Sequence, residues 1–210
     1  IGEAALQRYL TGRFFWAQRS PDALQKAGDE FAACAREAPD FAPAHSGLAD
    51  CQIVLAMYGF APPLRAADLA RGHHARALAL DPDSAEVQTA QGAIRLFFDW
   101  KLDDAERAFV RALALNPSYT TAHLAYGDLL MMRGEFDRGL ALIREAVKLS
   151  PFDLGLAMNL GDFLIFSGRF DEAVGQLEHT LAMDERFVPG RTRLAEALAL
   201  SGQGDAALAH

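Results

Sequence analysis

Histidine and cysteine side chains are the first candidates in this 210-residue chain for ligating a metal ion or for nucleophilic chemistry. His73 and His74 are adjacent, and neighbouring residues of a helix point in different directions. No set of cysteines and histidines has the spacing of a zinc site, and no serine or cysteine lies in a context that marks a nucleophile. Residues 201–204, the nearest approach to a glycine-rich phosphate loop, are interpreted as a turn. The sequence therefore predicts no catalytic centre, no metal and no cofactor.

Two of the candidates, His74 and Cys34, belong instead to the columns of a repeat. Four columns recur with steps of 43, 35, 34, 34 and 34 residues, as far as each extends. The columns are Ala27, Ala70, Ala105, Gly139, Ala173, Ala207; Phe31, His74, Phe109, Ile143, Leu177; Cys34, Ala77, Ala112, Ala146, Thr180; and Ala49, Gly92, Gly127, Gly161, Ala195. Such a period is typical of a structural unit that cannot bury its apolar face alone. Because His74 and Cys34 lie in packing columns, we expect them in the core.

Each repeat is predicted to contain two helices. In residues 118–151 the apolar spacing predicts helices over 119–132 and 136–149, with Gly134 ending the first and Pro151 preventing continuation of the second. The repeats of a single array over 1–210 are expected at 5–39, 40–82, 83–117, 118–151, 152–185 and 186–210. The second is expected to contain a long inter-helix loop, and the last to be truncated. Since the chain begins without Met, we expect a fragment of a longer protein.

This pattern resembles the tetratricopeptide repeat, whose 34-residue unit has preferred small residues, an aromatic or aliphatic residue and a proline at fixed positions. The fourth repeat matches it at Gly127, Gly134, Phe136, Ala146 and Pro151 and departs from it at Gly139. The resemblance implies an all-α fold, a right-handed α-solenoid of antiparallel helix pairs. It also implies that the first helix of each pair lines a concave groove that binds peptide segments or partner proteins.

The resemblance places the groove at positions 2, 5, 9, 12 and 13 of each first helix. Position 9 is a carboxylate in four of the repeats, and positions 12 and 13 are apolar from the second repeat onward. The expected groove residues are Tyr9, Arg13, Trp16, Asp50, Thr89, Leu124, Asp128, Met131, Met158, Asp162 and Glu196. Two interpretations stay open. Either the groove offers an acidic ridge beside an adaptable apolar strip to a partner with basic and apolar residues, or the carboxylates only solvate a helix face above packed apolar side chains.

Composition and charge exclude some partners. The net charge of −8 argues against nucleic-acid binding, which needs clustered Lys and Arg. No apolar run approaches the roughly 20 residues that span a bilayer. Two cysteines do not make a disulfide framework, so we expect a reduced, cytoplasmic setting.

The function expected from the resemblance is protein–protein interaction without catalysis, in the scaffolding or sensory part of a larger bacterial regulator. Residues 9–14 and 98–100 resemble arrays attached to bacterial winged-helix regulators, adenylate cyclases or protein kinases. One alternative is a homo-oligomerisation module, for which a homodimer is the simplest state. Another is the non-catalytic part of a parent cyclase or kinase.

Overall fold

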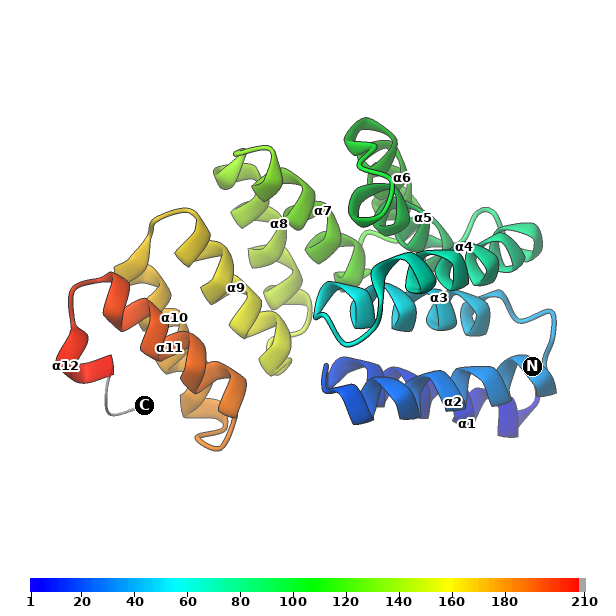
Figure 1. Cartoon of the computed structure of the whole chain (residues 1–210), viewed down its shortest axis with the longest axis horizontal. Coiled ribbons are helices and arrows are strands. Elements are labelled where there is room, and N and C mark those ends of the chain that lie inside the picture. The colour runs from blue at the N-terminus through cyan, green and yellow to red at the C-terminus, as the bar shows by residue number, and fades with distance from the viewer. Residues whose placement is uncertain (208–210) are drawn as a thin grey trace. The chain divides into compact units, whose positions relative to one another are not determined.

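The chain folds into helices joined by short turns (Figure 1). The computed structural model describes residues 1–207, and these contain no strand. The helices are α1 (Glu3–Ala17), α2 (Pro21–Glu37), α3 (Ala42–Met57), α4 (Pro63–Leu80), α5 (Ala85–Phe97), α6 (Leu102–Leu115), α7 (Thr120–Met132), α8 (Phe136–Leu149), α9 (Leu154–Phe166), α10 (Phe170–Met183), α11 (Val188–Leu200) and α12 (Gly204–Ala207). The all-α prediction is therefore confirmed. Within the described part of the chain, no helix is both long and apolar enough to cross a bilayer.

The helices group into two compact units, residues 1–117 (unit 1) and 118–210 (unit 2). In unit 1, α1 packs on α2, α3 on α4 and α5 on α6, and each pair also contacts the next. In unit 2, α7 packs on α8, α9 on α10 and α11 on α12 in the same way. The first helices of successive pairs touch as well, α1 with α3, α3 with α5, α7 with α9 and α9 with α11. Each unit is thus built from the expected helix pairs.

Small residues in the first helices allow the backbones to approach closely. A Cβ atom built on Gly92 of α5 would lie 2.4 Å from Cε1 of Phe109, and one built on Gly161 of α9 would lie 2.7 Å from Cδ2 of Leu177. Phe109 and Leu177 are fully buried. In these two repeats, the small residue of one column and the large apolar residue of the other therefore pack directly against each other.

Within residues 1–207, the turn between the two helices of each pair contains a residue with positive φ. Gly134, Gly168 and Gly202 have φ values of 76°, 75° and 85°. Glycine adopts this conformation without the steric cost that a Cβ atom brings. Arg19 and Trp100 occupy the comparable turns with φ values of 56° and 55°, so two of the turns carry backbone strain.

The second repeat is longer in its helices as well as in its turn. Helices α3 and α4 contain 16 and 18 residues, whereas α7 and α8 contain 13 and 14. The turn between α3 and α4 comprises residues 58–62, in which Tyr58 and Phe60 stack with ring centroids 5.9 Å apart. The extra residues of this repeat are therefore shared between the turn and its two helices.

Candidate partner-binding surfaces

In unit 1, a cluster of charged and aromatic side chains joins the end of α1 to α3. Trp16 is buried, and two guanidinium groups lie over its ring. Cζ of Arg13 is 4.7 Å and Cζ of Arg19 is 3.4 Å from the ring centroid, both within cation–π range. Nη1 of Arg13 is also 3.8 Å from Oδ2 of Asp50. The structure therefore brings three of the predicted groove residues, Arg13, Trp16 and Asp50, together.

Asp50 is the most deeply buried of the predicted carboxylates, at 7% exposed. Burial raises the pKa of this carboxyl from 3.8 to about 6, because the charged form loses its hydration. The charges of Arg13 and Arg19 act in the opposite direction, and Glu86 adds to the rise. The carboxylate is thus paired with Arg13 of its own chain and is also stabilised by the charge of Arg19.

Two other predicted residues of unit 1 pack against its own helices. Tyr9 packs against Phe31 and Phe41, with ring centroids 5.8 Å and 5.3 Å away. Thr89 is 3% exposed, and its hydroxyl donates a hydrogen bond to the carbonyl of Ala85 at 2.8 Å. Tyr9 thus packs against α2 and the residue before α3, whereas the hydrogen bond of Thr89 lies within α5. Thr89 is therefore a packing residue of α5 and offers almost no surface to a partner.

In unit 2, the predicted carboxylates lie on successive first helices, Asp128 on α7, Asp162 on α9 and Glu196 on α11. Arg193 of α11 contacts two of them. Its Nε is 3.0 Å from Oδ1 of Asp162, and its Nη1 donates to Oε2 of Glu196 at 2.8 Å. Burial raises the pKa of Asp162 from 3.8 to about 6, with Arg193 opposing the rise and Glu196 adding to it. A guanidinium group thus already fits between neighbouring carboxylates of this surface.

The predicted apolar residues of unit 2 are only partly available to a partner. Leu124, Met131 and Met158 are half-buried and pack against the core cluster of α8 to α11. They therefore help to hold the first helices together, as the alternative interpretation of the apolar strip supposes.

Three other apolar side chains on the first helices of unit 2 are more exposed. Met132 is 45%, Phe166 70% and Leu200 49% exposed, at the last residue of α7, α9 and α11. Each lies four residues after a predicted carboxylate, and residues so spaced are neighbours on a helix surface. The repeat period indicated this apolar position, but it could not show which of two adjacent apolar residues stays exposed.

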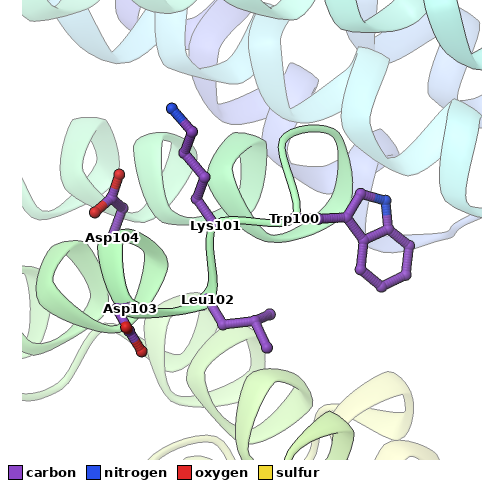
Figure 2. A pocket seen from close by; sticks show the side chains of 5 residues that line it. All are labelled: Trp100, Lys101, Leu102, Asp103 and Asp104. Atoms are coloured by element: carbon purple, nitrogen blue, oxygen red, sulfur yellow. The ribbon is translucent and has the colours of Figure 1, made fainter.

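A shallow pocket at the turn after α5 contains no arrangement suited to chemistry. It is lined by Trp100, Lys101, Leu102, Asp103 and Asp104. Figure 2 shows that the indole of Trp100 and the side chains of Lys101 and Leu102 point in different directions. In residues 1–207, no three His, Cys, Asp or Glu side chains are grouped so that they could hold a metal ion.

Comparison with known families agrees with the repeat pattern. Residues 101–153 match the sequence model of the tetratricopeptide repeat. A tetratricopeptide repeat protein from Thermus thermophilus has a similar structure, with a TM-score of 0.72 and 21% identity over 93% of this chain and all of that one. YrrB, described as a tetratricopeptide repeat protein with an unusual peptide-binding site, has a TM-score of 0.53 and 19% identity over 85% of this chain and 87% of its own. These similarities establish the fold.

A bacterial regulator shares sequence with most of the chain. The transcriptional regulator HilA of Salmonella typhimurium is 27% identical over 143 residues, which is 68% of this chain and 26% of that protein. The chain therefore spans about a quarter of the length of this relative.

Proposed function

We propose that this chain, an array of tetratricopeptide repeats, is a protein-interaction module whose first helices in unit 2 bind an extended segment of a partner protein. The segment carries basic residues interleaved with apolar ones. The module acts without catalysis, metal or cofactor, and its partner is a protein rather than a nucleic acid or a membrane.

The observation that carries this proposal is the repeated pairing of a carboxylate with an exposed apolar side chain. The pairs are Asp128 with Met132, Asp162 with Phe166 and Glu196 with Leu200. Because the pairs recur on adjacent helices that touch, we expect their side chains to form a row across unit 2. An extended segment that alternates basic and apolar residues matches such a row.

The contacts of Arg193 indicate how a basic side chain would be held. Arg193 lies against both Asp162 and Glu196, so the spacing of these carboxylates suits a guanidinium fork. Complementary charge steers a partner and makes its association sensitive to salt. We expect the apolar side chains to supply the desolvated contacts and the carboxylates to supply the selectivity.

The proposal is tested by titrating peptides with alternating Arg and Leu into the full chain and into charge variants. The substitutions Asp128→Lys and Asp162→Lys together are expected to weaken binding at least tenfold, about 1.4 kcal/mol. The control carries Asp171→Lys and Glu178→Lys, which make the same charge change on exposed positions of α10. Because the side chain of Asp162 is largely buried, circular dichroism checks that the first double variant keeps its helices. Unchanged affinity in the first double variant, or equal loss in the control, would contradict the proposal.

A separate apolar variant tests the other half of each pair. Phe166→Ala removes the most exposed of the three apolar side chains, so it should weaken binding of the peptide without disturbing the fold. Circular dichroism before and after heating checks that the helices and their stability are retained. If the peptide binds Phe166→Ala as tightly as it binds the wild type, then the apolar side chains Met132, Phe166 and Leu200 are not part of its binding site.

We further propose that the module belongs to a larger bacterial regulator, and the similarity to HilA supports this context. The regulator would use the array for scaffolding or sensing. Sequencing the gene on both sides of the segment, followed by a DNA-binding assay of its complete product, tests the idea. A complete gene without any regulatory domain would refute it.

The alternative of a homo-oligomerisation module has a direct test. Sedimentation of the purified chain gives its mass in solution. A stable dimer that no longer binds the Arg–Leu peptide would favour self-association over the partner-binding role, whereas a monomer that binds the peptide would exclude it.

A further inference from the structure

Unit 1 contains a small pocket between α4 and α5 that the proposed partner-binding surface does not use. Its volume is about 180 Å³. Its lining includes Arg71, His74, Leu78, Ile94, Arg95 and Asp99. The pocket thus combines basic groups with an apolar wall.

Two arginines are held at this pocket by one carboxylate. Nη2 of Arg71 donates to Oδ1 of Asp99 at 2.7 Å, and Nη1 of Arg95 donates to Oδ2 of Asp99 at 2.7 Å. Burial alone would raise the pKa of Asp99, but its hydrogen bonds and charge pairing with the two arginines lower it overall. Nη1 of Arg71 also donates to Oδ1 of Asp68 at 3.4 Å. Each guanidinium has five N–H donors, so these carboxylates orient both groups without using all of their donors.

His74 lines the same pocket without a hydrogen-bond partner. The residue is 9% exposed, and neither Nδ1 nor Nε2 has a partner within the structure. In the equivalent column, Phe31 and Phe109 are fully buried and need no polar partner. Burial, and to a smaller extent the charge of Arg95, lowers the pKa of His74 to about 4. The ring is therefore neutral at pH 7 and offers one donor and one acceptor.

Leu78 and Ile94 provide the apolar wall of the pocket. An engineered apolar cavity of about 150 Å³ is large enough to bind benzene. A pocket of 180 Å³ is therefore of the right size for one ring or a short branched chain.

We propose that this pocket binds a small carboxylic acid with a compact apolar body. The carboxylate accepts hydrogen bonds from the remaining donors of Arg71 and Arg95 and from the ring N–H of His74, while the apolar body lies against Leu78 and Ile94. The site would add small-molecule sensing to an interaction module, and it does not depend on the partner surface of unit 2.

The probe for this site is benzoate, titrated into the full chain at pH 7. Binding is followed by calorimetry and by NMR of the histidine ring nitrogens, with the His74 resonances assigned by their absence in His74→Phe. We expect benzoate to shift the His74 nitrogens. Benzamide, which has the same ring without the charge, and inorganic phosphate, which has charge without a ring, should each bind at least tenfold more weakly.

Three variants separate this site from general attraction of anions. His74→Phe introduces the residue found at Phe31 and Phe109 and is expected to keep the fold. This variant should lower the affinity for benzoate at least tenfold, and Arg95→Gln should do the same. The matched control Arg76→Gln removes a charge from α4 outside the pocket, where Arg76 pairs with Asp40, and it should leave affinity unchanged.

Several results would overturn the proposal. They are an absence of His74 shifts at millimolar benzoate, equal affinity for benzamide or phosphate, and an equal loss in Arg76→Gln and Arg95→Gln. Should His74→Phe fail to fold, the wild-type titration and the two arginine variants still decide the matter.

Discussion

Asp50 shows how a single residue of the candidate surface can influence the stability of the fold. Its carboxyl has a pKa of about 6 in the folded chain, above the value of 3.8 expected without burial. Between about pH 4 and pH 6, Asp50 therefore keeps its proton in the folded chain but loses it in the unfolded chain. The stability that protonated Asp50 contributes is present below about pH 4 and is lost as the pH rises through about 6.

We expect Asp50→Asn to remove this loss. The free energy of unfolding at pH 8 should rise by about 1–3 kcal/mol, because one pKa unit corresponds to 1.36 kcal/mol and the net shift from 3.8 to about 6 already includes the opposing charge of Arg13. At pH 4 the variant should show no gain. Urea denaturation at both pH values measures the difference, and Asp29→Asn, at an exposed position of α2, serves as control. An equal effect at both pH values would contradict the argument.

At the scale of the elements, close helix packing depends on residues without side chains. Gly92→Ala should lower the free energy of unfolding by about 1–3 kcal/mol, because the new methyl group would overlap the buried ring of Phe109. The matched substitution Gly72→Ala lies within α4, where nothing is within 4 Å of the new Cβ. It should stabilise the chain by about 0.5–1 kcal/mol. Thermal denaturation compares the two variants. If Gly92→Ala were more stable than Gly72→Ala, the close packing of Gly92 against Phe109 would be contradicted.

The turn after α5 offers a second prediction at this scale. Trp100 is left-handed and 71% exposed, so its side chain contributes little burial in return for the strain (Figure 2). A left-handed residue other than glycine costs about 1–2 kcal/mol. Glycine also raises the conformational entropy of the unfolded chain, which offsets part of this gain. Trp100→Gly should therefore stabilise the fold by up to about 1 kcal/mol. Trp100→Ala keeps the strain and should give no such gain in the same chemical denaturation series.

The same elements show what the sequence can and cannot predict. In the fourth repeat the apolar spacing predicts helices over 119–132 and 136–149, and α7 and α8 occupy Thr120–Met132 and Phe136–Leu149. Gly134 and the proline after α8 leave the backbone few alternatives there. Trp100 could not be predicted as left-handed, since the glycine that usually marks such a turn is absent. The contact between Arg193 and Asp162 was equally hidden, because it depends on side-chain rotamers across two repeats.

At the scale of the whole molecule, stability should follow from contacts between neighbouring pairs. A repeat array needs about three units before its buried surface outweighs the entropy of ordering the chain. Unit 1 contains three helix pairs, α1 with α2, α3 with α4 and α5 with α6.

We therefore expect residues 1–117, expressed alone, to fold into a helical fragment that unfolds cooperatively. Residues 1–80, which retain only two pairs, should be much less stable. Circular dichroism during heating compares the two fragments. A fragment 1–117 without a cooperative transition would indicate that unit 1 is not an independent folding unit.

Cys34 and Cys51 are the only cysteines of the chain, and both are buried in unit 1. The thiol of Cys34 donates to the carbonyl of Ala5 at 3.1 Å, and burial raises the pKa of both thiols. Because the thiolate is the form that reacts, an alkylating reagent can modify them only when the surrounding helices separate. The rate of alkylation therefore reports how often the first two helix pairs open, and it does so without any engineered label.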